Sequence, residues 1–132
     1  MLNRIDIPSA GGRRIPALHA GHGPRAALLV HGITAEKTES GLYLRLAERL
    51  RARGVGVLSM DLPGHGDSTV AFEDASVTQM VEDLVHAHRF LAERHAAVSL
   101  VCMSFAASVY LLASAAGLPG CEGVVLLNPV TD

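Results

Sequence analysis

The sequence predicts an α/β fold built around a parallel β-sheet. Short apolar runs recur along the chain, as buried parallel strands do: AALLVHG, VGVLSMD, AVSLVC and GVVLLNP. Segments with helical spacing of apolar residues separate these runs, and this alternation is typical of a parallel sheet. The chain has 132 residues, of which 49% are hydrophobic and 18% charged. This composition suits one domain with a buried core and argues against disorder.

The first twenty residues predict an antiparallel hairpin. Residues 2–7 alternate apolar and polar side chains, SAGG at 9–12 is a turn signal, and residues 13–20 form the returning strand. Pro16 lies in that returning strand. Because proline has no N–H to donate to a ladder, we expect this strand at an edge of the sheet.

Two amphipathic helices carry recognisable end signals. Residues 42–53 place leucines at helical spacing, and Gly54 follows where a left-handed glycine often ends a helix. The second helix is predicted to begin at Ser76, which forms a capping box with Gln79, and to run to about His95.

An uncharged run extends from Ala96 to Cys121. It is long enough for a membrane-spanning helix, which needs about 20 apolar residues. The strand–helix alternation instead predicts a buried strand at 97–102 and a helix at roughly 104–116. The run also contains several serines and the chain has no tryptophan to anchor a span. We therefore expect no membrane span.

Ser104 falls at the predicted joint between that strand and that helix. A sharp strand-to-helix turn, the nucleophile elbow, often presents a catalytic serine, and it needs small residues two before and two after the serine. Ser104 has Cys102 and Ala106 at these positions, whereas Ser99 and Ser108 each have a bulky residue at one of them. The alternative is that Ser104 simply caps the helix, and the segment CMSFAA alone leaves both interpretations open.

Two further loops follow the first two buried strands. HGIT at 31–34 follows the first, and DLPGHGDS at 61–68 follows the second. Ligands of parallel sheets bind at the carboxyl ends of the strands. The backbone N–H of Ile33 and that of Phe105, which follows Ser104, are therefore candidates for an oxyanion hole. An ordinary loop explains the glycines of the second segment but not the order of the three segments.

These segments resemble the N-terminal half of an α/β-hydrolase, in particular the serine aminopeptidase/monoglyceride-lipase-like branch of esterases and acyl hydrolases. The matching pieces are LLVHGIT, LYLRLAERLRARG, MDLPGHGDS, LVCMSFAAS and VVLLNPVTD, so the resemblance covers essentially all of residues 1–132. It implies a truncated α/β-hydrolase domain with about six strands and three main helices, without the C-terminal strands and lid. The family's usual elbow has glycines where this chain has Cys102 and Ala106. By resemblance, the residues with structural roles in the two glycine loops are His31, Gly32, Asp61, Gly64, His65, Gly66 and Ser68.

The resemblance implies a serine hydrolase that cleaves a carboxylic ester, thioester or amide through an acyl-enzyme on Ser104. It implies a small-molecule acyl substrate and no metal or organic cofactor. Acyl transfer by the same acyl-enzyme and a non-catalytic remnant or binding module are the alternatives. In the family, an acid and then a histidine follow the serine, but here Glu122 and Asp132 follow it and no histidine does. We therefore expect a part of a larger enzyme, with Asp132 a candidate for the acid.

Charge, cysteines and histidines exclude several other classes. The net charge is −2 and the basic residues are scattered, which argues against nucleic-acid binding. Cys102 and Cys121 lie in apolar surroundings, and the N-terminus has no secretory signal, so we expect reduced thiols in a cytoplasmic protein. His19 and His22 lack a third metal ligand.

With no strand beyond residues 123–129, we expect self-association or pairing with the missing C-terminal portion.

Overall fold

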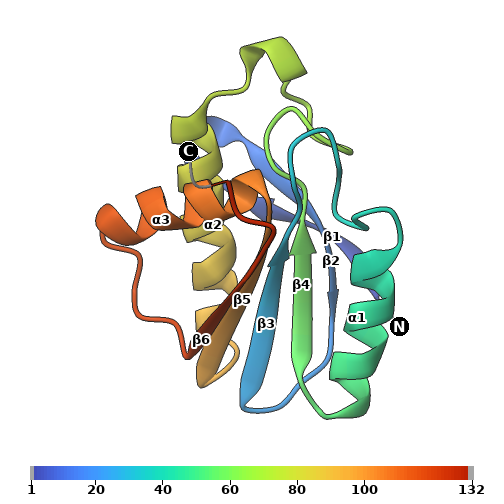
Figure 1. The fold of residues 1–132 in the computed structure, drawn as a ribbon. Helices are drawn as coiled ribbons and strands as arrows, with labels where there is room; N and C mark the ends of the chain where they lie inside the picture. Colours follow the sequence, from blue (N-terminus) through green and yellow to red (C-terminus); the bar gives the residue numbers. More distant parts are fainter. Residues whose placement is uncertain (1, 131–132) are drawn as a thin grey trace.

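A computed structural model describes residues 2–130. Within these residues, a six-stranded sheet has the order β1-β2-β4-β3-β5-β6 (Figure 1). The strands are β1 (Asn3–Pro8), β2 (Arg14–Ala20), β3 (Arg25–Val30), β4 (Gly56–Met60), β5 (Ala97–Met103) and β6 (Gly123–Leu127). The helices are α1 (Leu42–Ala52), α2 (Val77–Ala92) and α3 (Phe105–Ala115), with short 3-10 turns η1 (Ala10–Gly12) and η2 (Phe72–Asp74). The predicted α/β fold with an N-terminal hairpin and three main helices is confirmed.

The position of the strand that contains Pro16 differs from the prediction. β2 is not an edge strand, because it pairs antiparallel with β1 on one side and with β4 on the other. Pro16 lies just past the Ala17–Met60 pair that ends the β2–β4 ladder. Its carbonyl faces β4 and accepts a hydrogen bond from the Asp61 N–H at 2.8 Å. The N and O of a strand residue point to the same side, so the missing N–H faces the end of that ladder and leaves β1–β2 pairing intact.

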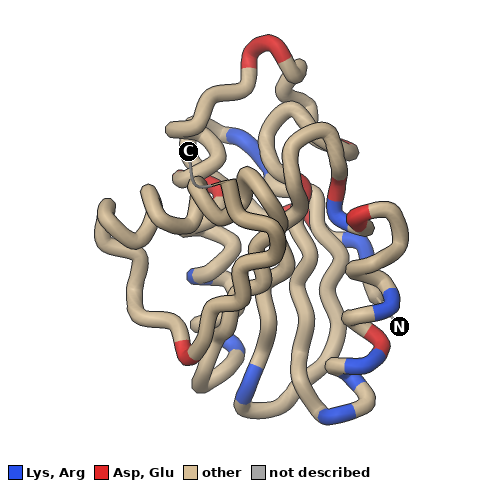
Figure 2. The backbone as a smooth tube through the Cα atoms, in the orientation of Figure 1, with Lys and Arg blue, Asp and Glu red and all other residues tan. Residues whose placement is uncertain are grey.

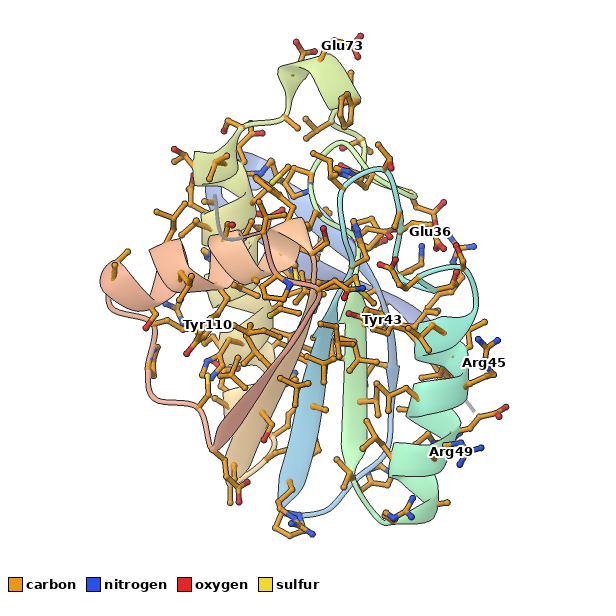
Figure 3. All side chains as sticks on the ribbon, viewed as in Figure 1. Glu36, Tyr43, Arg45, Arg49, Glu73 and Tyr110 are labelled. Carbon is orange, nitrogen blue, oxygen red and sulfur yellow. The ribbon has the colours of Figure 1, made fainter. Side chains whose placement is uncertain are left out.

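Helices cover both faces of the sheet, with α1 on one face and α2 and α3 on the other (Figure 1). Consecutive strand residues point to opposite faces, so Leu28 joins the core under α2 and α3 while Leu29 joins the core under α1. Both leucines are fully buried, which explains the continuous apolar run in the sequence. Tyr43 points from α1 to the sheet (Figure 3), where its hydroxyl donates to the Val30 carbonyl at 2.7 Å.

The uncharged run is divided between a strand and a helix, as the sequence predicts. β5 ends at Met103 and α3 begins at Phe105. The tube of α3 and β6 carries no charged residue, and Glu122 precedes β6 (Figure 2). Among residues 2–130, no helix combines the length and the hydropathy that crossing a bilayer requires.

The predicted helix-end signals are present, with one difference in length. Ser76 Oγ accepts from the Gln79 N–H and Gln79 Oε1 accepts from the Ser76 N–H, both at 3.1 Å, so the capping box is confirmed. Gly54 after α1 has φ 75°. The second helix ends at Ala92 rather than near His95. His95 lies beyond the end of the helix, and its Nδ1 atom is 2.8 Å from the Gly23 carbonyl oxygen.

Candidate active site

The loops after β3, β4 and β5 meet at one end of the sheet, at the top of Figure 1. Parallel strands direct their carboxyl ends to this edge. The backbone of Gly32, after β3, lies against Ser104, after β5: a Cβ added to Gly32 would lie 3.4 Å from the Ser104 Cβ. The HGIT loop therefore lies directly beside the serine.

Ser104 occupies a strained turn between β5 and α3. Its backbone has φ 52° and ψ −116°, a conformation that residues other than glycine rarely adopt. Such a conformation costs on the order of 1–3 kcal/mol and is found where the surrounding structure enforces it. Here the Ser104 N–H donates to the Leu127 carbonyl of β6 at 2.8 Å. The Ser104 side chain makes no capping hydrogen bond to α3, so the geometry favours an elbow over a simple cap.

The residues two before and two after Ser104 are completely enclosed. Cys102 and Ala106 are each 0% exposed and belong to the core under α2 and α3. Burial, with a smaller contribution from Cys121, raises the pKa of the Cys102 thiol to about 12. Cys102 therefore remains a protonated core thiol, which packs where the family's usual elbow has glycine.

Two backbone N–H groups in the segments around Ser104 have no hydrogen-bond acceptor among the described residues. Within residues 2–130, the N–H groups of Ile33 and Phe105 donate to no protein acceptor. The residues on either side of Ile33 are anchored: the Gly32 N–H donates to Glu39 Oε2 at 2.8 Å, and the Thr34 N–H donates to His65 Nε2 at 3.0 Å. Phe105 begins α3, so its N–H also lies at the positive end of the helix dipole.

His31 and His65 each use Nε2 to join the two loops and Nδ1 to bond within their own loop. His31 Nε2 accepts from the Leu62 N–H at 3.0 Å, so the proton lies on Nδ1, which donates to the Gly32 carbonyl at 2.7 Å. His65 Nε2 accepts from Thr34, and its Nδ1 donates to the Pro63 carbonyl at 3.0 Å. The two rings lie 5.0 Å apart. Neither histidine has a free nitrogen with which to act as a substitute base for Ser104.

The PGHGDS loop folds around the carboxylate of Asp61, which is 1% exposed. Gly66 has φ 54°, and a Cβ there would overlap this carboxylate. Gly64 has φ 81°, and a Cβ there would lie 2.9 Å from the Ala75 Cβ. Ser68 Oγ accepts from the Gly64 N–H at 3.2 Å and closes the turn. These close contacts explain why glycine, which has no Cβ, occupies positions 64 and 66.

Comparison with known proteins decides the family. The family model described as serine aminopeptidase, S33, matches residues 22–132. The chain belongs to this family of α/β-hydrolases. No curated protein matches the chain. An α/β-hydrolase from Sphaerobacter thermophilus is 30% identical, with a TM-score of 0.77, over 97% of this chain and 47% of its own.

Other solved structures share the fold of this S33-family chain at lower identity. An esterase from Pyrococcus furiosus is 18% identical, with a TM-score of 0.81, over 98% of this chain and 49% of its own. Est1E from Butyrivibrio proteoclasticus, solved with ferulic acid bound, is 19% identical, with a TM-score of 0.82, over 93% of this chain and 52% of its own. The S33-family chain thus spans about half the length of the solved structures that it matches.

Two acidic candidates of the S33-family chain remain, Glu122 and Asp132. Asp132 lies outside the described residues. Glu122 precedes β6, so it lies at the amino end of the parallel strands, opposite the serine. Among the described residues, no group of three His, Cys, Asp or Glu side chains is placed to hold a metal ion. Sequence reasoning missed Lys37 and Glu39, because no local spacing marks a residue whose partner is brought to it by the fold.

We expect the S33-family chain to lose stability as the pH falls from 6.5 to 4. Burial lowers the pKa of His31 from 6.5 to about 4, although the Gly32 carbonyl and Asp61 partly oppose this shift. The unfolded chain therefore takes up the proton first, so the stabilisation is complete above pH 6.5 and is lost towards pH 4. The loss is about 3 kcal/mol in the free energy of unfolding.

Urea unfolding of the longest natural chain at pH 7.5, 6.0 and 4.5 measures this effect in the wild type, in His31→Gln and in His22→Gln. His22 is exposed and serves as the matched control. We expect His31→Gln to be less stable at pH 7.5 but to have a shallower pH dependence, whereas His22→Gln follows the wild type. Equal pH slopes in all three proteins would contradict the assignment.

Proposed function

We propose that this chain carries the nucleophile and the oxyanion hole of a serine hydrolase that cleaves an ester, thioester or amide of a carboxylic acid. The observation that carries the proposal is the strained conformation of Ser104, φ 52° and ψ −116°, at the joint between β5 and α3. Residues held in such conformations cluster at active sites. The uncapped hydroxyl and the free N–H groups of Ile33 and Phe105 support the same role.

In the proposed reaction, Ser104 Oγ attacks the carbonyl carbon of the substrate and its proton passes to a histidine. The carbonyl oxygen becomes an oxyanion, which accepts hydrogen bonds from the N–H groups of Ile33 and Phe105. When the tetrahedral intermediate collapses, the histidine returns the proton to the leaving group and an acyl-enzyme remains. Water then attacks the acyl-enzyme, releases the acid and restores the serine. We propose that this histidine and its acid come from residues beyond Asp132 in a longer natural chain.

The structural relatives favour carboxylic esters among the possible substrates. The Pyrococcus protein and an Exiguobacterium antarcticum protein are both described as esterases. Est1E was solved with ferulic acid, an aromatic carboxylic acid. These proteins share the fold of this chain, so we propose that the carbonyl attacked by Ser104 belongs to an ester of a small carboxylic acid.

We expect a fluorophosphonate probe to label Ser104 in the longest natural chain that contains this sequence. The probe forms a covalent bond with an activated serine, and mass spectrometry of the digested protein locates the adduct. Ser108→Ala is the matched control and should be labelled as fast as the wild type. An adduct on Ser99, Ser108 or Cys102 would overturn the assignment. A folded chain that the probe does not label at all would indicate a non-catalytic remnant.

A further inference from the structure

Lys37 is a buried lysine in the loop that carries the proposed oxyanion donor. It lies between β3 and α1, four residues after Ile33, and is 7% exposed. Lysine is rarely buried unless it is paired, because removing an ammonium group from water is costly. The proposed mechanism does not use Lys37 chemically, so its burial requires another explanation.

Every polar group of Lys37 contacts β4 or the loop that follows β4. Its Nζ donates to Asp61 Oδ2 at 2.7 Å and to Asp67 Oδ2 at 2.8 Å. Its main-chain N–H donates to Asp61 Oδ1 at 2.8 Å, and its carbonyl accepts from Ser59 Oγ. Lys37 is therefore a cross-link between the HGIT loop and the PGHGDS loop.

The surroundings of Lys37 keep its ammonium group charged. Burial by itself lowers the pKa of Lys37, but hydrogen bonds to Asp61 and Asp67 outweigh it, so the pKa lies above its usual value. The Asp61 carboxylate also accepts from the Asp67 N–H at 2.9 Å. Charge-assisted hydrogen bonds of this kind are about twice as strong as neutral ones and have defined directions. The pair can therefore hold a loop in one position.

The residues on both sides of Ile33 are held by hydrogen bonds. The Thr34 N–H is held by His65 Nε2 on one side, and the Gly32 N–H is held by Glu39 on the other. Lys37 fixes the segment that follows. We propose that Lys37 is a positioning residue, which holds the Ile33 N–H beside Ser104 through its buried ion pair with Asp61. This inference rests on the proposed function in one respect, namely that the Ile33 N–H binds the oxyanion.

Removing the ammonium group should move the loop. The Asp61 carboxylate would stay buried with fewer donors, which is strongly destabilising until the backbone shifts to let water in. An oxyanion donor acts by being in place before charge develops. A displacement of about 1 Å can cost roughly 10²-fold in rate.

The test compares Lys37→Met with Arg4→Met in the longest natural chain. Arg4 also pairs with Asp67, at 2.6 Å, but from the exposed side and from β1. With a p-nitrophenyl ester, we expect Lys37→Met to lower kcat about 10- to 100-fold while KM changes less than about 2-fold. Arg4→Met should change neither constant. Unchanged kcat in Lys37→Met would overturn the proposal.

A double variant separates positioning from a general loss of stability. Lys37→Met with Asp61→Asn removes the uncompensated buried charge, and the amide oxygen can still accept from the main-chain N–H of residue 37. We expect its melting temperature to exceed that of Lys37→Met while its kcat stays low, because the ion pair that cross-links the loops is still absent. Recovery of kcat together with the melting temperature would show that Lys37 acts through stability alone and would overturn the positioning role.

Amide hydrogen exchange tests the cross-link without any turnover. In Lys37→Met we expect exchange at Gly32 and Thr34, whose N–H groups are hydrogen-bonded to Glu39 and His65, to accelerate about 10-fold or more, with exchange at Leu28 in β3 unchanged. Equal exchange in the variant and the wild type would overturn the inference. If the wild-type enzyme shows no turnover and no probe labelling, the proposed function fails, and the exchange experiment still decides whether Lys37 holds the loop.

Discussion

Replacing Ser104 by alanine is expected to lower ester turnover by the longest natural chain roughly 10⁴- to 10⁶-fold, the loss typical when a serine nucleophile is removed. Ser104 Oγ is the atom that bonds to the acyl group, and the buried Cys102 thiol, whose pKa is raised to about 12, cannot replace it. Ser104→Gly should lose turnover to the same extent. Ser108→Ala, in the same helix, should keep it. Turnover retained in Ser104→Ala would place the nucleophile elsewhere.

The two inactive variants should differ in stability. Alanine at 104 keeps the Cβ that conflicts with φ 52° and ψ −116°, whereas glycine adopts this conformation readily. We expect Ser104→Gly to have a free energy of unfolding about 1 kcal/mol or more above that of Ser104→Ala. Urea unfolding at pH 7.5 measures the difference. Equal stabilities would show that the elbow is relaxed in solution and that strain does not mark this site.

Residues 1–132 expressed alone are expected to form oligomers or aggregates. Within the described residues, β6 pairs with β5 on one side and has no neighbour on the other. Its sequence, GVVLL, has no charge or proline to discourage pairing with another chain, and Val125 is 50% exposed. Parallel strands are ordinarily covered on both faces.

An apolar groove lies beside this open edge. It has a volume of about 590 Å³ and lies between α1 and β6, with Leu46, Leu50, Val101, Val125 and Leu127 among its lining residues. Covering such surface contributes about 25 cal/mol per Å² of apolar area. A second chain that covers it would therefore be stabilised, which adds to the tendency of the edge strand to pair.

Light scattering and ester turnover of this span and of the longest natural chain, measured side by side, check the expectation. Val125→Lys places a charge on the open strand and should raise the monomer fraction of the isolated span. Arg49→Lys, on the exposed face of α1, is the matched control and should not. A monodisperse wild-type monomer with the turnover of the longest chain, abolished by Ser104→Ala, would show that this span carries its own general base.

Local signals in the sequence determined the elements and the joint between β5 and α3. The capping box of Ser76 and Gln79 and the left-handed Gly54 act on a few neighbouring residues, so they could be recognised without the fold. Small residues on both sides of Ser104 identified the same joint by a local steric requirement, and its backbone has the strain expected of an elbow. The continuous apolar run of β3 predicted a strand because both faces of this strand are buried.

Tertiary structure alone decided the position of β2 and the anchoring of the proposed oxyanion loop. Pro16 could lie in an inner strand because the β2–β4 ladder ends beside it, and the end of a ladder depends on the partner strand. Lys37 and Asp61 are 24 residues apart, and Thr34 and His65 are 31 apart. A buried ion pair depends on the exclusion of water and on the positions of both partners, and the folded chain creates both conditions.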